Sequence, residues 1–355
     1  MPCARAIHQP PENKGLRHFA APNRAELLRG LTKVAAMLYL GISVNLSLFD
    51  EPSAFDRAGL AARLRELAEQ RIWIGTSSWK YEGWVGQIYS RERYVTRGKF
   101  SKARFEAECL GEFAETFPAV CGDFSFYQFP TPEFWKKLFT GAPPQLKFGL
   151  KVPEEVTVEV FPRHPRYGAR AGQQNPAYLN TEALKALLLE PLERHRERIG
   201  PLILEFGARS TPPREFFGNL DAFLSELPGT FRYAVEVRNR EFLQPAYFDT
   251  LRAHQTAHVF NAWTRMPQLH EQMAMEAAFT TDFTVTRALL RQGRAYEDAV
   301  KQFAPYDKTQ DENPEARRAL RELLRRMKEE RKAAYIFVNN RLEGNAPATI
   351  EAVVS

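Results

Sequence analysis

The chain has 355 residues, of which 44% are hydrophobic and 26% charged, so its composition excludes a largely disordered protein and allows a sizeable core. The formal net charge of +6 is small for this length and only mildly favours anionic partners. The three cysteines, Cys3, Cys109 and Cys121, match no zinc motif and indicate a reducing, cytoplasmic setting. Cys109 and Cys121 are expected to be small buried residues.

The first part of the chain, residues 1–70, is interpreted as an N-terminal extension. About its first 20 residues are rich in proline, asparagine and basic side chains, which predicts disorder. Residues 54–70 form a predicted amphipathic helix with three leucines on one face: Leu60, Leu64 and Leu67. Residues 71–355 are the predicted main domain.

The most apolar stretch of the extension covers residues 31–49. Lys33 and several polar residues interrupt it, so we expect no membrane helix there. It also lies far from the start of the chain for a signal peptide.

Strand-like runs and helical patterns alternate along the main domain. The strands are expected at residues 72–76, 120–126, 147–152, 201–206, 231–238, 256–262, 282–286 and 334–339. Helices are expected at residues 101–116, 132–138, 181–198, 213–227, 245–254 and 313–332, and the polar residues 296–314 are read as a loop or insertion.

This alternation favours a parallel sheet with right-handed crossovers, and eight strands are the number that closes it. The predicted fold class is therefore α/β, a (β/α)8 TIM-like barrel with an N-terminal extension. An open doubly wound sheet is the alternative, but no G-x-G-x-x-G motif follows any of the strands.

Side chains in a barrel strand alternate between the outer helices and the lumen. In three of the strands the apolar residues occupy one set of alternate positions, which predicts the outer face. The opposite set carries charged residues near the strand ends: Lys151, Glu205, Glu236 and Arg238. The C-terminal ends of the strands are where barrel enzymes hold their chemistry.

Five short motifs then occur at strand ends in a familiar order. They are residues 74–79 (IGTSSW) with Tyr81, Trp84 and Tyr89; Phe126-Tyr127 with Pro130; residues 148–153 (FGLKVP) with Thr157; residues 234–238 (AVEVR); and Asn339-Asn340 with Gly344, Ala346 and Pro347. Together they resemble the YecE-like family, also called domain of unknown function 72, from about Ile72 to Val353. The resemblance implies a TIM-like barrel of uncharacterised activity. The chain departs from the family pattern at Ser78, where glycine is usual, and around Cys121 and Asp123.

Glu236 and Arg238 are the strongest candidates for chemistry, because a lumen does not tolerate an unpaired charge. Glu236 is proposed as a catalytic acid or base and Arg238 as a substrate-binding cation. A structural ion pair that fills the barrel is an equal alternative.

Lys151 is the second catalytic candidate, as a base or Schiff-base amine, with anion binding or pairing to Glu205 or Glu236 as the simpler reading. Four further side chains near strand ends are predicted to contact substrate: Glu205, Arg287, Asn339 and Asn340. Arg287 borders the loops that often bind phosphate in barrels.

Aromatic residues after the first two strands are predicted to line the mouth: Trp79, Tyr81, Trp84 and Tyr127. Aromatic rings suit sugars and nucleobases. A hydrophobic lid that packs over the barrel is the alternative reading.

No metal site is predicted, because the histidines form no ligand motif. A divalent cation on Asp123, Glu205, Glu236 or Asp282 is left open as an alternative. The cofactor and the oligomeric state remain unknown at this stage.

The leading function hypothesis is an enzyme of hydrolase or lyase type that acts on an anionic or sugar-like ligand. The alternative is a nucleic-acid-binding protein without catalysis. It rests on the basic last long helix, with Arg317, Arg318, Arg321, Arg325, Arg326 and Lys328, and on the aromatic mouth. A partner-binding scaffold is a third reading.

Overall fold

The computed structural model describes residues 55–209 and 211–355 of the chain. The predictions for the first 54 residues, including the disordered start, the apolar stretch 31–49 and Cys3, lie outside the described residues.

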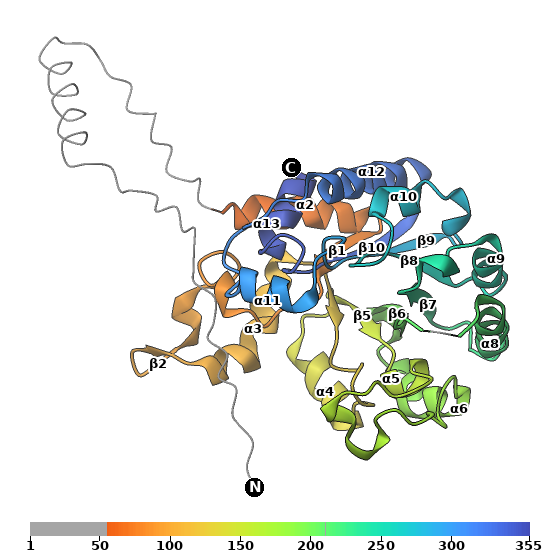
Figure 1. Ribbon diagram of the computed structural model, residues 1–355. Coiled ribbons are helices and arrows are strands. Elements are labelled where there is room, and N and C mark those ends of the chain that lie inside the picture. The colour runs from red at the N-terminus through yellow and green to blue at the C-terminus, as the bar shows by residue number, and fades with distance from the viewer. Residues whose placement is uncertain (1–54, 210) are drawn as a thin grey trace, which may run out of the picture. The chain divides into compact units, whose positions relative to one another are not determined.

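The described residues form a closed barrel of eight parallel strands (Figure 1). Each strand pairs with its neighbour in sequence, and the first strand pairs with both the last and the second, which closes the sheet. The predicted (β/α)8 fold is thus confirmed. The strands are β1 (Ile72–Thr76), β4 (Ala119–Gly122), β5 (Lys147–Lys151), β6 (Ile199–Phe206), β7 (Arg232–Val237), β8 (Ala257–Ala262), β9 (Phe283–Ala288) and β10 (Ala333–Val338).

Helices surround the strands, and most of the predicted ones are present. The longer ones are α2 (Arg57–Glu69), α3 (Lys102–Thr116), α4 (Pro132–Gly141), α8 (Pro213–Ser225), α9 (Pro245–Ala253), α12 (Pro314–Glu330) and α13 (Ala346–Val354). Several begin at a side chain that accepts a hydrogen bond from a backbone N–H of the first turn, as Ser101, Thr131 and Asn313 do. The capping residue and a proline after it explain why α4 and α12 begin where they do.

Helix α2 packs on the barrel although the sequence pattern assigned it to the extension. Leu60 and Leu64 are fully buried in the same hydrophobic cluster as the outer faces of the strands. The compact unit runs from Phe55 to Ser355 and includes this helix.

The second strand ends four residues earlier than its sequence predicts. It stops at Gly122, and the backbone then turns, with the Phe126 N–H donating to Asp123 O at 3.1 Å. The Ser125 hydroxyl donates to Lys151 O at 2.6 Å, so the turn is held against the next strand. Tertiary contacts therefore override the strand propensity of this apolar run.

Two further segments differ from their predictions. The expected helix 181–198 is divided into α6 (Thr181–Leu184), a π-helical turn (Lys185–Leu189), α7 (Glu190–Glu193) and a 3-10 turn (Arg196–Arg198). Pro191 lacks an N–H and interrupts regular helical hydrogen bonding there. The polar segment 296–314 contains helix α11 (Tyr296–Phe303), because Ala299 and Phe303, four residues apart, are both buried.

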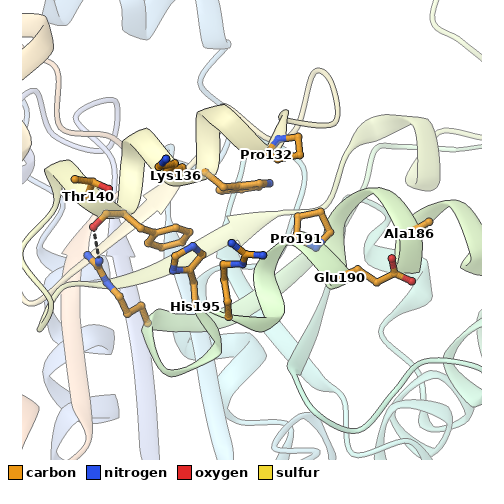
Figure 2. Close-up of a pocket in the computed structure, with 11 residues that line it drawn as sticks. Pro132, Lys136, Thr140, Ala186, Glu190, Pro191 and His195 are labelled. Carbon is orange, nitrogen blue, oxygen red and sulfur yellow. Dashed lines mark hydrogen bonds between the residues drawn. The ribbon is translucent and has the colours of Figure 1, made fainter.

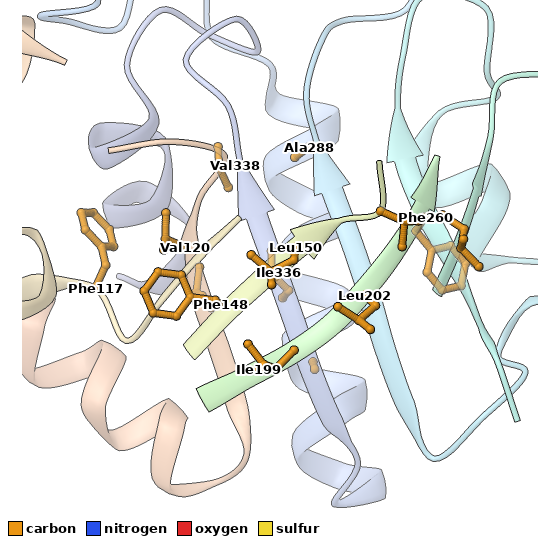
Figure 3. Close-up of a cluster of buried hydrophobic side chains, with 14 of the residues drawn as sticks. Phe117, Val120, Phe148, Leu150, Ile199, Leu202, Phe260, Ala288, Ile336 and Val338 are labelled. Carbon is orange, nitrogen blue, oxygen red and sulfur yellow. The ribbon is translucent and has the colours of Figure 1, made fainter. Parts of the chain in front are cut away.

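The two faces of the strands carry two separate hydrophobic clusters. The outward cluster, part of which Figure 3 shows, includes Phe148, Leu150, Leu202 and Ile336 and packs against the helices. The lumen cluster is made of the alternate residues, among them Ala119, Cys121, Ile203, Ala234, Val259, Val285, Tyr335 and Phe337. The predicted alternation of β5, β6 and β7 is therefore present, and the lumen is a packed core up to its C-terminal layer.

Gly149 makes room in the lumen for the ring of Phe337. A Cβ on Gly149 would lie 2.6 Å from Phe337 Cζ. We expect Gly149→Ala to lower the free energy of unfolding by about 1–3 kcal/mol through overpacking, measured by urea denaturation.

Two variants check this explanation. Adding Phe337→Leu to Gly149→Ala removes the clash and is expected to recover part of the loss. Gly111→Ala, in helix α3 with open space around its Cβ, is expected to stabilise the protein by about 0.5–1 kcal/mol. An unchanged stability of Gly149→Ala would contradict the packing argument.

Both cysteines of the described residues are buried, as their sequence predicts. Cys109 and Cys121 are free and fully buried, and burial raises the pKa of each thiol to about 12, so neither is a reactive thiolate. Among the residues described, no helix combines the length and the apolar character needed to cross a bilayer.

Candidate active site at the barrel mouth

Six charged side chains meet at the C-terminal end of the barrel. Lys151, Glu205, Glu236 and Arg287 come from β5, β6, β7 and β9, and each occupies a lumen position near the end of its strand. Arg238 and Asp123 follow directly after β7 and β4. All six are linked by ion pairs, so the structure brings together five of the residues that the sequence selected, with Asp123 in addition.

The two glutamates are the centres of this network. Glu205 Oε2 lies 3.1 Å from Lys151 Nζ, 3.4 Å from Arg238 Nη2 and 2.6 Å from Arg287 Nη1. Glu236 is fully buried; its Oε2 lies 2.5 Å from Arg287 Nη1, and its Oε1 pairs with Arg238 Nη2. Each glutamate therefore joins cations from different strands across the lumen.

Three cations and three carboxylates make the network neutral overall, which is the condition for keeping it buried. Burial by itself would raise the pKa of Glu205, but Lys151, Arg238 and Arg287 hold that pKa well below its ordinary value. Burial would lower the pKa of Arg287, and Glu236 and Glu205 outweigh it and raise the pKa well above normal. Both groups therefore stay charged at neutral pH.

Asp123 is held differently from the two glutamates. Its Oδ1 is buried but lies 3.7 Å from Lys151 Nζ and 3.8 Å from Arg287 Nη2, and no described residue forms a hydrogen bond with it. The side chain as a whole is 41% exposed. Asp123 is thus the carboxylate of the network that reaches the solvent-facing side of the mouth.

Aromatic rings pack over two of the three cations of the network, Lys151 and Arg238. The Lys151 ammonium lies 3.5 Å from the centre of the Phe126 ring, and the Arg238 guanidinium lies 4.0 Å from that of Trp263. Cation–π contacts of this kind stabilise partly desolvated cations. Both rings are partly exposed, so they form the apolar walls of the mouth.

The four aromatic residues predicted to bind substrate differ in how much of each side chain is exposed. Trp84 is fully buried and stacks with Tyr89 and Phe113, so it offers no surface to a ligand and its expected binding role finds no support. Trp79 is 8% exposed and packs edge-on against Phe124.

The other two are more accessible. Tyr81 is partly exposed. Burial of its hydroxyl raises the pKa of Tyr81, and the positive charge of Arg341 opposes part of this rise. Tyr127 is 59% exposed, beside Phe126 and under the Arg166 guanidinium at 5.0 Å. Tyr127 is therefore the predicted aromatic residue that is most open to a ligand.

The asparagine pair after β10 serves the local backbone. Asn339 Oδ1 accepts from the Arg341 N–H at 2.9 Å, and Asn340 Oδ1 accepts from the Ala346 N–H at 2.8 Å. Both are buried, and the Nδ2 of Asn340 has no hydrogen-bond partner among the described residues. These contacts indicate a structural role for the pair in the turn after β10, and its predicted contact with substrate finds no support here.

Asn261 is a member of the site that is absent from the sequence-based predictions. This residue of β8 is fully buried, and its Oδ1 accepts from Arg238 Nη1 at 3.3 Å. It follows Ala257 and Val259 on the lumen face, so the same alternation that selected Glu236 could have selected it. Trp263, two residues further, continues the same face.

Within residues 55–209 and 211–355, no three His, Cys, Asp or Glu side chains gather in an arrangement that could hold a metal ion. Of the carboxylates left open for a cation, Asp282 precedes β9 and lines a cavity at the N-terminal end of the strands, with Lys147 and Arg232. It is therefore not a member of the mouth network.

Three of the six basic residues named for α12, Arg317, Arg325 and Arg326, pair with acidic neighbours. Arg325 pairs with Glu322 and Glu329, both at 2.5 Å, and Arg326 pairs with Glu276 and Glu330. These acidic partners reduce the positive charge that α12 could offer to a phosphate backbone, and neither the fold nor the family gives support to nucleic-acid binding.

The fold and the site define a class: a (β/α)8 barrel with a buried ion-pair network at its C-terminal mouth. The family model described as "Protein of unknown function DUF72" matches residues 73–355. The chain belongs to this family, in agreement with the resemblance of its motifs.

Solved structures of two DUF72 family proteins are similar to this chain. The one from Thermotoga maritima has 18% identity and a TM-score of 0.54, covering 79% of this chain and 96% of its own. The one from Enterococcus faecalis has 17% identity and a TM-score of 0.53, covering 79% and 94%. At these identities the likeness concerns the fold. No curated protein matches the chain.

Proposed function

We propose that this protein is an enzyme of hydrolase or lyase type that binds a small anionic or sugar-like substrate at the barrel mouth. The observation that carries the proposal is the loose position of Asp123 Oδ1, 3.7 Å from Lys151 Nζ and 3.8 Å from Arg287 Nη2 and without a hydrogen bond from any described residue. The other contacts of these two cations with carboxylates lie within 3.1 Å.

In this proposal Lys151 and Arg287 bind the negatively charged oxygen atoms of the substrate. Their charges then stabilise the negative charge that develops on a substrate oxygen during hydrolysis or proton abstraction. Asp123, which is part-exposed, accepts a proton from water or from the substrate. Phe126 and Trp263 supply apolar walls for the rest of a small ring.

Glu205 and Glu236 have a positioning role in the same proposal. Glu236 is fully buried: its Oε2 accepts a hydrogen bond from Arg287, and its Oε1 is enclosed in an ion pair with Arg238 without a hydrogen bond from a described residue. A carboxylate without exposed surface is a poor acid or base for a substrate. We therefore assign the proton transfer first proposed for Glu236 to Asp123, and leave Glu236 to orient Arg238 and Arg287.

The test is a binding screen by thermal shift and calorimetry with glucuronate, glucose 6-phosphate and glucose. We expect an anionic sugar to bind more tightly than glucose, and Lys151→Met to weaken it at least about tenfold. Lys147→Met is the matched control, because Lys147 lies on the same strand and face at the opposite end of the barrel. Asp123→Asn is expected to keep binding and to lose turnover of any substrate the screen yields. Equal effects of the two lysine variants, or no binding of either anion, would refute the mouth site.

A further inference from the structure

A second cavity, of about 550 Å³, lies outside the barrel between α4 and the segment that carries the π-helical turn and α7. Figure 2 shows Lys136 and Thr140 on the α4 wall facing Pro191 and His195 on the other. This volume is within the range of small-molecule sites. None of the residues lining it belongs to the mouth network.

The floor of this cavity, here called the α4 pocket, is aromatic. Trp135 is 1% exposed and Phe139 is 6% exposed, and the His195 ring stacks on Phe139 at 4.1 Å between ring centres. The indole N–H of Trp135 is buried and has no acceptor among the described residues. Because that nitrogen has no exposed surface, it does not contact a ligand in the pocket.

The rim of the α4 pocket is positively charged. Lys136 and Arg194 are exposed, and within the described part of the chain neither forms an ion pair. Arg198 is already occupied, since its guanidinium donates to Phe139 O at 2.7 Å and to Pro143 O at 2.8 Å. Burial, then Arg194 and Arg198, lower the pKa of His195, which leaves its ring neutral near pH 7.

We propose that the α4 pocket binds a small aromatic carboxylate, with its ring against the stacked rings of Phe139 and His195 and its carboxylate between Lys136 and Arg194. An aromatic ring in the ligand can pack on the stacked rings of the floor. Among the described residues, the rim carries two unpaired cations, Lys136 and Arg194, and one carboxylate, Glu190, so a ligand with a single negative charge balances it. A doubly charged phosphate would gain little from the apolar floor, and a neutral ring would leave both cations unused.

The probe is 2-naphthoate, titrated into the full chain by calorimetry. We expect saturable binding that 2-naphthamide, the neutral analogue, reproduces only weakly. The double variant Lys136→Gln/Arg194→Gln is expected to weaken 2-naphthoate binding at least about tenfold.

Matched controls separate this site from general charge effects and from the mouth. Lys137→Gln/Arg196→Gln removes the same charge from neighbouring exposed positions that do not line the pocket, and is expected to leave binding unchanged. Lys151→Met, at the mouth, is also expected to leave it unchanged. Absence of saturable binding, equal loss in the two double variants, or loss in Lys151→Met would each overturn the proposal.

Discussion

The variant Glu236→Ala is expected to lose about 3–5 kcal/mol of its free energy of unfolding, the range measured when one partner of a buried ion pair is removed. Glu236 is fully buried and binds Arg287 Nη1 at 2.5 Å as well as Arg238. Its removal leaves three cations against two carboxylates, and the side chains of Arg238 and Arg287 are only 6% and 3% exposed, so water replaces the lost partner poorly. Urea denaturation followed by circular dichroism measures the change.

The control for this prediction is Glu322→Ala on α12. Glu322 also pairs with an arginine at 2.5 Å, but both side chains are more than half exposed. Water and salt screen such a pair, so we expect no measurable change in stability. If Glu236→Ala proved as stable as the control variant, the mouth network would have to be weakly coupled or open to water.

The second large effect is expected for Glu112, a buried carboxylate that joins α2, α3 and the loop between β1 and α3. Glu112 is 2% exposed and accepts hydrogen bonds from the Ser90 N–H at 2.9 Å, the Tyr94 hydroxyl at 2.7 Å and Arg57 at 3.1 Å. Replacing it with alanine removes the acceptor of the Ser90 N–H and the Tyr94 hydroxyl, while Arg57 keeps Glu115 and Thr116 as partners. We expect a loss of about 3–5 kcal/mol in the free energy of unfolding at pH 7.

The same residue predicts a pH dependence of stability. Burial would raise the pKa of Glu112, but the hydrogen bonds from Ser90 and Tyr94 outweigh it and hold the pKa below its ordinary value of 4.5. Its contribution to stability is therefore complete above pH 4.5 and is lost as the pH falls through the lower pKa of the folded state.

Unfolding measured from pH 7 downward checks this sign with Glu112→Gln, which cannot ionise. The stability difference between wild type and Glu112→Gln is expected to shrink below pH 4.5. Glu115→Gln is the matched control, because Glu115 contacts the same two arginines, Arg57 and Arg93, but is half-exposed. A difference that stays constant down to low pH would show that folding does not shift the pKa of Glu112.

The charged mouth was largely predictable from strand alternation. Lys151, Glu205 and Glu236 were selected because a period of two separates lumen from outer positions, and Arg287 because of its place near a strand end. The place of Asp123 in the site was not predictable from strand alternation. The second strand ends at Gly122, and Asp123 lies in the turn that follows, where the alternation no longer applies.

Aromatic residues were less predictable, because a large ring has the same hydrophobic signature at a mouth and in a core. Trp84 packs on α3 through Phe113, a contact between residues that are not close in the sequence. Trp263 lies over Arg238 across two neighbouring strands. Such pairings depend on which elements become neighbours.

Local periodicity predicts the eight strands, their order and the outward faces that meet the helices, because crossover connections follow from the alternation of strands and helices. Only the tertiary structure decided which charges pair, that Glu236 is enclosed while Asp123 is accessible, and that α2 belongs to the barrel unit. The reason is physical: the partners and burial of a side chain depend on closure of the sheet, which sums contacts from every strand and is not a property of any one segment.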